Sequence, residues 1–258
     1  MRIHTNGNAA RLGVTLVVPA LFALGAAAQN ASRDAGPSLD EVIQKSIEAR
    51  GGADKIKAIQ NVKLTGKMLL MGGQVEAPCV IIVKRPAFMR TSLDIQGQAL
   101  VRAFDGATGW TINPFMGSGE AQKLSDDETR DMQDGIDLDG PLVDYKAKGH
   151  TVELAGKEDV QGALAYKLKI NKKSGKIDYA YLDTKTFLPV KTVTKATVQG
   201  SQAEIESYPS NYKPVNGVMS PFSVEQKIGG QTMMQMTIDK MEPNVEIDDT
   251  IFKMPAKK

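Results

Sequence analysis

The stretch AFDGATGW, residues 103–110, decides which kind of fold the sequence encodes. It places Asp105 and Gly106 between two short apolar runs and includes the only tryptophan of the chain, Trp110. Asp-Gly is typical of tight hairpin turns because both residues tolerate the unusual backbone dihedral angles of such turns. A catalytic acid is the alternative interpretation, but no partner residue accompanies Asp105 in this stretch. The stretch therefore predicts a turn between strands over 101–104 and 109–114.

Apolar and polar residues alternate with a period of two on both sides of this hairpin. From Asn61 onward, Val62, Leu64, Met68 and Leu70 are apolar, and polar residues stand between most of them. Such alternation is typical of strands with one buried face, and Gly, Asn or Ser marks most of the turns between them. The pattern predicts strands over 62–70, 75–84, 88–95, 99–104, 109–114, 164–170, 177–181, 188–197, 203–212, 218–228 and 232–241.

Helical signals flank and interrupt the strands. Ser38 with Glu41 forms a capping box, and the apolar residues after it fall at helical spacing. Gly51-Gly52 ends this helix at about Arg50, and a shorter helical stretch follows over 53–59. An acidic stretch over 125–140, with Ser125 as its cap, predicts a further helix. We expect a mainly β fold with covering helices, in which one large curved antiparallel sheet buries its concave face under them.

The first 28 residues have the features of a secretory signal peptide. Arg2 and Arg11 precede or flank an apolar run over 12–24, and small residues at 26–28 suit a signal peptidase. The run is too short to span a bilayer, although an uncleaved anchor is the alternative. We expect cleavage near Ala28, a polar leader over 29–37, one domain over 38–258 and a periplasmic location.

Charge balance argues against a nucleic acid partner. Without Arg2 and Arg11, the 32 basic residues fall to 30 and equal the 30 acidic residues. A protein with zero net charge has no general attraction for polyanions. We therefore expect no nucleic acid partner.

Residues for familiar catalysis are scarce in the exported part. It has one histidine, His150, and one cysteine, Cys79, which stands beside the apolar run 80–83. Hydrolytic triads need a histidine base with an orienting acid, and zinc sites need several His or Cys ligands. We interpret His150 as a surface residue and Cys79 as a buried structural thiol, and we expect no enzyme activity, metal or cofactor.

Two clusters could suggest a metal but have simpler interpretations. The acidic residues over 126–139 do not follow the ligand order of an EF-hand, so we interpret them as a solvated helix face. Met233, Met234 and Met236 could bind cuprous copper, but Met234 and Met236 alternate with polar residues as one face of a strand does. We therefore interpret Met234 and Met236 as core or cavity lining.

Four segments, taken in order, resemble the outer-membrane lipoprotein carrier and lipoprotein-sorting family, the LolA/LolB-like superfamily. They are VKRPAFMRTSL at 83–93, AFDGATGWTINP at 103–114, YLDTKTFLPVK at 181–191 and YKPVNGVMSPFSV at 212–224. The resemblance implies a half-open β-barrel of about 11 strands, with lid helices over an apolar cavity for acyl chains. It also implies that Arg90 matches the arginine that holds the lid helices closed.

The stretch ARGGADKIKAIQNVKLTG at 49–66 is more typical of less-studied relatives of that family, and it leaves the cargo open. We expect a periplasmic, monomeric carrier of lipid or lipidated protein, with a membrane protein as possible donor or acceptor. A protein-interaction or stress-sensing module without lipid cargo is the alternative. The alternation predicts a cavity lined by Leu64, Met68, Leu70, Met89, Leu93, Trp110, Leu168, Met234 and Met236.

Overall fold

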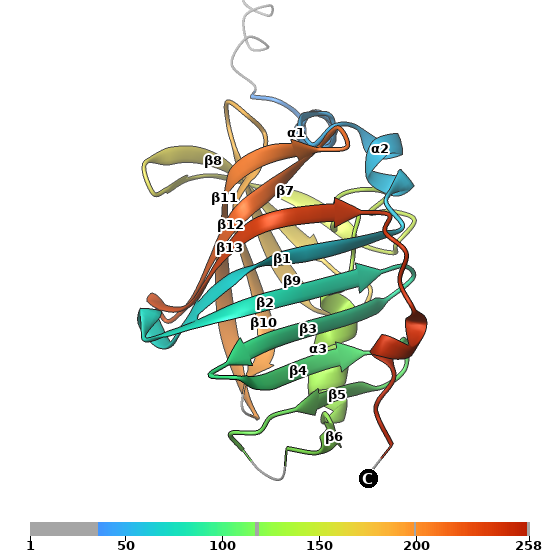
Figure 1. The fold of residues 1–258 in the computed structure, drawn as a ribbon. Helices are drawn as coiled ribbons and strands as arrows, with labels where there is room; N and C mark the ends of the chain where they lie inside the picture. Colours follow the sequence, from blue (N-terminus) through green and yellow to red (C-terminus); the bar gives the residue numbers. More distant parts are fainter. Residues whose placement is uncertain (1–35, 117–118, 199, 257–258) are drawn as a thin grey trace, which may run out of the picture. The chain divides into compact units, whose positions relative to one another are not determined.

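A single antiparallel sheet of 13 strands forms most of the unit Pro37–Lys258 (Figure 1). The computed structural model describes residues 36–116, 119–198 and 200–256. The predicted signal peptide and its cleavage site lie outside the described residues. The sheet runs in the order β6-β5-β4-β3-β2-β1-β13-β12-β11-β10-β9-β8-β7 and is not closed, which confirms the curved half-barrel with covering helices.

The first part of the chain forms one half of the sheet as a simple meander. Its strands are β1 (Asn61–Leu70), β2 (Val75–Lys84), β3 (Phe88–Ile95), β4 (Gln98–Phe104), β5 (Gly109–Ile112) and β6 (Ala121–Lys123). A short 3-10 turn, η1 (Met71–Gly73), joins β1 to β2. At the β4–β5 hairpin, Asp105 accepts hydrogen bonds from the backbone N–H groups of Ala107 and Thr108, which confirms its interpretation as a turn residue.

The rest of the chain forms the other half as a second meander. Its strands are β7 (Thr151–Val160), β8 (Ala163–Asn171), β9 (Ile177–Asp183), β10 (Pro189–Val198), β11 (Ser201–Val215), β12 (Val218–Ile228) and β13 (Gln231–Pro243). Pairing of β13 with β1 joins the two meanders. The sheet has two strands more than expected, because the sequence pattern missed β6 and β7.

Cross-strand register fixes which side chains share a face. Met68 pairs with Ala77 on one side and with Met236 on the other, so these three side chains lie on one face. The pairing with β13 shifts at Gly66, where a Cβ atom would lie 2.1 Å from the carbonyl oxygen of Thr237. Glycine is therefore required at this irregularity, and bulges of this kind increase the local twist of a sheet.

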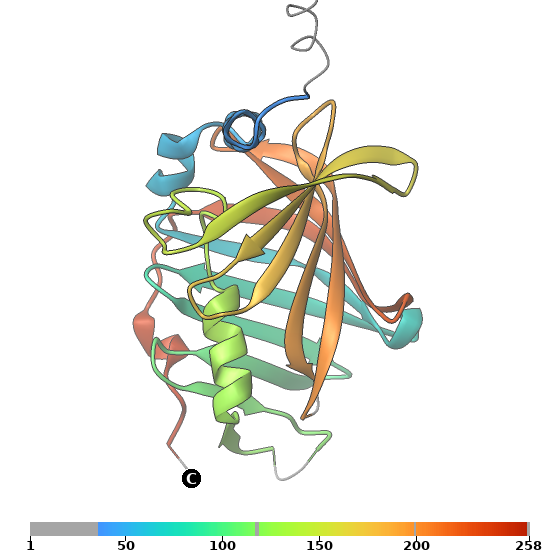
Figure 2. The ribbon, with the colours of Figure 1, turned by 180° about the vertical axis from the view of Figure 1, so that it is seen from behind.

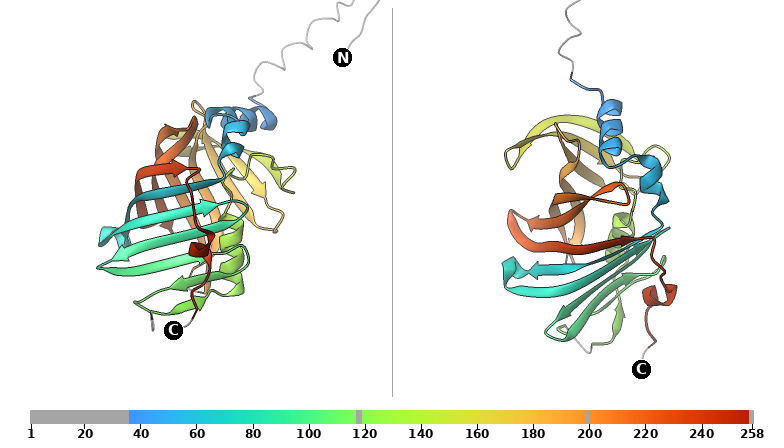
Figure 3. Two further views of the ribbon diagram at one scale, coloured as in Figure 1. Left: turned by 45° about the vertical axis from the view of Figure 1, so that its right-hand side comes forward. Right: turned by 45° about the horizontal axis from the view of Figure 1, so that its top comes forward.

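Two helices cover one end of the concave face (Figure 3). Helix α1 (Leu39–Ala49) has Ser38 as its N-cap, and the Ser38 side chain accepts from the N–H of Glu41, which is one half of the predicted capping box; the Glu41 carboxylate pairs with Lys45. The helix buries Val42 and Ile43 against β8 and β9. Helix α2 (Ala53–Ala58) packs Ile56 against Val143 and Val218.

Helix α3 (Asp126–Gly135) lies across the concave side, between β4 and β5 on one side and β10 on the other (Figure 2). Ser125 and Glu128 form a complete capping box. None of its side chains is buried, and its acidic residues Asp131 and Asp134 both contact Lys176. The acidic face of α3 is therefore its attachment to the sheet and not simply a solvated surface.

Arg85, in the turn between β2 and β3, joins the helices to the sheet. Its Nε donates to the carbonyl of Ile59 at the end of α2 (2.8 Å), and its guanidinium forms a bidentate ion pair with Asp139. Arg50, at the end of α1, donates to the backbone carbonyl of the same Asp139 (2.7 Å). Asp139 is buried, so this cluster connects α1, α2 and the segment after α3 to the turn between β2 and β3.

The C-terminal segment covers the convex face at the other end of the sheet. Its 3-10 helix η2 (Asp249–Phe252) follows β13. Trp110 is fully buried beneath it, and its indole N–H donates to the carbonyl of Phe252 (2.7 Å). Arg90 donates to the carbonyl of Ile251 (2.8 Å), so it binds the C-terminal segment and contacts no carbonyl of α1, α2 or α3 that the structure describes.

We expect Trp110→Ala to lower the free energy of unfolding by about 3–5 kcal/mol, because it removes a fully buried aromatic side chain and leaves the carbonyl of Phe252 without its donor. Urea titration followed by circular dichroism measures this loss. Phe115→Ala, which changes a half-exposed aromatic residue, should shift the value by less than about 0.5 kcal/mol. Equal losses in both variants would contradict the assignment.

The Arg85 guanidinium holds the pKa of Asp139 below its ordinary value, although burial of the carboxyl opposes this. The pair therefore stabilises the fold at pH values above the unfolded pKa of about 3.9, and that contribution is lost as the pH falls through the lower, folded value. We expect Asp139→Asn to lower the free energy of unfolding by about 2 kcal/mol at neutral pH. Its stability should also fall less steeply than wild type on acidification, as chemical denaturation at successive pH values measures.

Asp144→Asn is the matched control, because Asp144 forms an exposed pair with Lys57. Exposed pairs contribute little to stability, so this variant should retain the acid profile of the wild type. An unchanged acid profile in Asp139→Asn would show that the buried pair does not control the acid response.

Candidate functional site

An extended apolar cluster lies on the concave face where the two meanders meet. Its eight buried members come from β1, β2, β3, β12 and β13, and ten partly buried residues pack around them. No described residue of α1, α2 or α3 belongs to it. We call it the concave apolar face; its buried members are Met68, Ala77, Cys79, Ile81, Leu93, Phe222, Met236 and Ile238.

Antiparallel register arranges this face in rows across the strands. One row runs from Leu93 through Cys79 to Gly66 and Ile238. A neighbouring row pairs Met68 with Ala77 and with Met236, and the next row pairs Leu70 with Val75 and with Met234. The rows form a continuous apolar surface from β12 to β3, because alternate residues of each strand point to the same side.

Part of this surface remains accessible. Leu64, Leu70, Met89 and Met234 are only half-buried, although they pack against the buried members. A filled core would bury these side chains as completely as Leu168 or Trp110 is buried. The half-buried ring of apolar side chains is the property expected of a surface that accepts an apolar ligand.

Seven of the nine predicted cavity residues lie on the concave apolar face. They are Leu64, Met68, Leu70, Met89, Leu93, Met234 and Met236. Met234 and Met236 share this face, as the alternation predicted, and Met233 is exposed at the register shift between β12 and β13 and does not belong to the face.

The other two predicted residues lie elsewhere. Leu168 is on the same side of the sheet but is fully buried beneath α1, in contact with the cluster of Val42 and Ile43. Trp110 pairs with Ala103 and faces the convex side, under the C-terminal segment. The structure therefore does not bring Trp110 or Arg90 to the concave apolar face.

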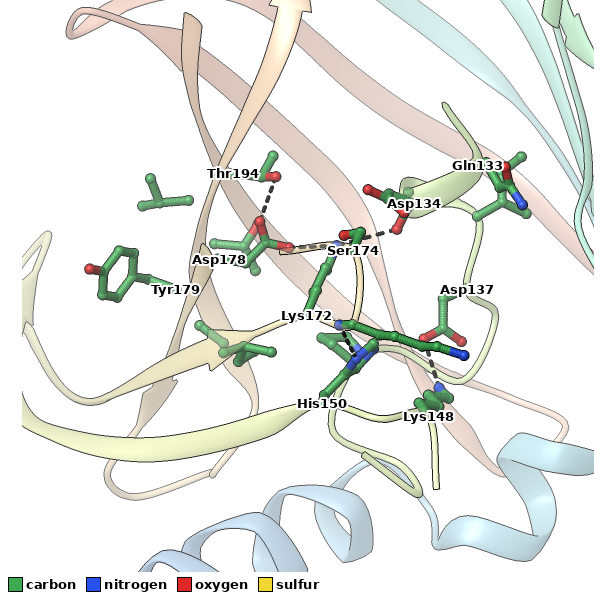
Figure 4. A pocket seen from close by; sticks show the side chains of 18 of the residues that line it. Gln133, Asp134, Asp137, Lys148, His150, Lys172, Ser174, Asp178, Tyr179 and Thr194 are labelled. Atoms are coloured by element: carbon green, nitrogen blue, oxygen red, sulfur yellow. Dashed lines mark hydrogen bonds and ion pairs between the residues drawn. The ribbon is translucent and has the colours of Figure 1, made fainter. Parts of the chain in front are cut away.

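A second feature of the concave side is a polar cleft of about 790 Å³ (Figure 4). Its walls are the end of α3 with the loop after it, the turn after β8, and β9 and β10. His150, Lys172 and Asp178 line it together with apolar Ile170 and Ala180. We call it the polar cleft.

Two ion pairs lie in the polar cleft. Lys172 and Asp178 form a largely buried ion pair (2.6 Å), and Asp178 also accepts a hydrogen bond from the hydroxyl of Thr194 (2.7 Å). Lys148 pairs with Asp137 (2.7 Å). These pairs fix the cleft wall, and Lys148 and Lys172 each have an acid that neutralises them.

His150 is half-buried at this cleft, and its Nδ1 accepts a hydrogen bond from the N–H of Lys173 (3.1 Å). Burial, together with Lys148 and Lys172, lowers the pKa of His150. The imidazole is therefore neutral at pH 7, with its proton on Nε2. Sequence reasoning placed it at the surface and did not connect it with the lysines after β8. The sequence offered no local signal for this cluster, because its residues are separated in the chain and come together only in the 13-strand sheet.

Cys79 is buried within the concave apolar face, as its sequence context predicted. Burial raises the pKa of its thiol, so it is protonated and unreactive at neutral pH. Among the described residues, no three His, Cys, Asp or Glu side chains are grouped so that they could hold a metal ion. In the part of the chain that the structure describes, no helix has the length and apolar character needed to cross a membrane.

Comparison with protein-family models finds no match. Comparison with curated protein sequences finds none either. Several crystal structures, in contrast, share this fold. Their sequence identities to this chain are low, so they show likeness of fold alone.

Three of these structures superpose over most of both chains. A DUF1329 family protein from Desulfovibrio piger has a TM-score of 0.57 at 12% identity, covering 83% of this chain and 96% of its own. A domain from Vibrio parahaemolyticus, described as an outer membrane lipoprotein-sorting protein, has a TM-score of 0.54 at 13% identity, covering 82% and 94%. A LolA superfamily protein from Nitrosomonas europaea has a TM-score of 0.52 at 13% identity, covering 84% and 98%. The chain therefore has a LolA-like fold, as the four sequence segments indicated.

Proposed function

We propose that this protein is a periplasmic carrier that binds lipid acyl chains on its concave apolar face. The observation that carries the proposal is the half-buried state of Leu64, Leu70, Met89 and Met234, on an extended apolar surface to which the described helices contribute no side chain. Moving an acyl chain from water onto such a surface is favourable by about 0.8 kcal/mol per buried CH₂ group.

Methionine suits this role, and five methionines belong to this face or pack against it. Met68, Met89 and Met234 have flexible thioether side chains that adapt to chains of different length and curvature. The ligand class is therefore an acyl chain, which belongs either to a free lipid or to a lipidated protein. The Vibrio domain shares this fold, and its description names lipoprotein sorting. This likeness supports a lipidated protein as the ligand of this chain. A membrane protein would then act as donor or acceptor.

Helix α3 is the best candidate for a moving lid. It spans the concave side, buries none of its own side chains, and contacts the far side of the sheet through Lys176 and the backbone of Thr197. Such polar attachments open more readily than a buried apolar interface. We propose that release of α3 from Lys176 widens the access to the concave apolar face.

Met234→Glu should weaken binding of a fluorescent fatty acid at least tenfold, because it places a charge beside the bound acyl chain. Met233→Glu is the matched control, since the neighbouring residue is already exposed and does not belong to the concave apolar face. Fluorescence titration with monomeric ligand measures both dissociation constants, and circular dichroism checks that both variants fold.

Leu70→Gln tests the same surface with a smaller polar change and should weaken binding in the same direction. Native mass spectrometry of protein purified from the periplasm, followed by lipid extraction, should find a bound lipid or acylated peptide. A ligand-free protein that also takes up no fluorescent fatty acid would contradict the carrier proposal. The protein-interaction module would then be the better interpretation of the fold.

Lys176→Ala should increase hydrogen exchange of the α3 amides roughly tenfold, because it removes the cation that contacts Asp131 and Asp134. Arg130→Ala is the control on the same helix, where Arg130 forms an exposed pair with Asp127 only. Exchange measured by mass spectrometry should not change in that variant. Faster exchange in both variants would point to a general weakening of the helix instead of its release from the sheet.

A further inference from the structure

The polar cleft has walls from both halves of the sheet (Figure 4). Most of its lining belongs to the second meander and to the end of α3, but Ala87, in the turn between β2 and β3, also lines it. Met89, two residues after Ala87, packs on the concave apolar face. The cleft therefore reaches the border of that face, and an elongated molecule can contact both.

Each of the three acids that line the polar cleft is already bound to a lysine. These pairs are Asp134–Lys176, Asp137–Lys148 and Asp178–Lys172. Asp137 also accepts from the N–H of Asp139 (3.1 Å), and Asp178 also accepts from the hydroxyl of Thr194 (2.7 Å). A ligand that enters the cleft therefore meets no carboxylate without a cation.

Lys173 also lines the cleft, and it forms no ion pair with a described residue. Its backbone N–H donates to Nδ1 of His150 (3.1 Å). Its stem lies against the backbone of Gly149, where a Cβ atom would be 3.3 Å from Cδ of Lys173. Both contacts hold this exposed lysine beside His150, so the cleft has one positioned cation that no acid neutralises.

Two further hydrogen-bond donors lie next to Lys173. The imidazole proton of His150 is on Nε2, and neither this N–H group nor the hydroxyl of Ser174 has a partner in the described chain. No buried side-chain nitrogen or oxygen of the described residues lacks a partner, so both groups are accessible from the cleft. An ammonium, an imidazole N–H and a hydroxyl are donors that the oxygens of carboxylates and phosphates accept.

We propose that the polar cleft binds the headgroup of the lipid whose acyl chain lies on the concave apolar face, and that this headgroup is an oxyanion with one negative charge. A carboxylate and a phosphodiester both have this chemistry. Lys173 supplies the opposite charge, and His150 and Ser174 donate hydrogen bonds to the headgroup oxygens. One unpaired cation matches one negative charge, because a second would remain uncompensated beside the acids of the cleft.

The apolar part of the cleft lining suits the beginning of the acyl chain. Ile170, Ala180 and Ala87 line the cleft together with the polar groups, as is common in sites that orient an amphiphile by a few polar contacts. The inference rests on the proposed function and specifies its ligand, since the chain on the concave apolar face is what brings the headgroup to the cleft.

Isothermal titration of delipidated protein tests the headgroup site with three probes that share a ten-carbon chain. The probes are decanoate, decan-1-ol and decanoyl lysophosphatidylglycerol. The wild type should bind decanoate at least tenfold more tightly than decanol, because only decanoate has a charged headgroup. Lys173→Met, which keeps an unbranched apolar stem, should bind decanoate, the lysophospholipid or both about fivefold more weakly and decanol as wild type does.

Two further variants separate the site from a general effect of substitution. His150→Asn retains an acceptor near the position of Nδ1 but removes the Nε2–H donor, so it should weaken the anionic probes and leave decanol binding unchanged. Lys185→Met is the matched control, because Lys185 is an exposed lysine in the turn between β9 and β10 and does not line the cleft. It should bind all three probes as wild type does, and circular dichroism checks the fold of each variant.

Unchanged binding of both anionic probes by Lys173→Met would overturn the headgroup site. An equal loss with decanol would overturn it too, because the lysine would then act on the fold or on the apolar surface. Acetate that binds as tightly as decanoate would also contradict it, since the cleft would then hold a small free anion. Wild-type protein that binds decanol and decanoate equally refutes this inference alone, whereas protein that binds neither refutes the carrier proposal.

Discussion

The pairing of β1 with β13 is the constraint on which the structure depends. It joins the beginning and the end of the folded unit, and it converts two local meanders into one sheet of 13 strands. Every other strand pair in the sheet links consecutive strands, so this is the long-range contact that chain entropy opposes most. The concave apolar face lies across this junction, and it would not exist in either meander alone.

The distribution of covering elements explains why one apolar surface stays accessible. Helix α1 covers β8 and β9, α2 packs against Val143 and Val218, and the C-terminal segment covers Trp110 on the convex side. Each of these surfaces is fully buried and serves stability. The surface across β12, β13, β1, β2 and β3 has no such cover in the described chain, and the curved sheet shields it only partly.

Much of the fold could be predicted from the sequence, since alternating strands and Gly-containing turns are local signals. β6 could not, because three residues carry no periodicity, and β7 could not, because most of its residues are exposed and Gly156 interrupts the pattern. It was harder still to predict on which face of the sheet Trp110 lies. Alternation places it opposite to Thr111, but only the C-terminal segment, more than a hundred residues away, explains why the convex position is buried. The same applies to the helix-binding arginine, which is Arg85 and not Arg90.

An open sheet keeps its concave face reachable, but it also leaves two edge strands with unpaired backbone groups. Such edges invite pairing with another chain, and long apolar edges aggregate. Here β6 is only three residues long, and β7 presents Glu153, Lys157, Glu158 and Asp159 along its length. Short length on one edge and charge on the other discourage self-association through the backbone. The polar character of β7, which hid it from the sequence pattern, thus protects the edge of an unclosed sheet from strand pairing with another chain.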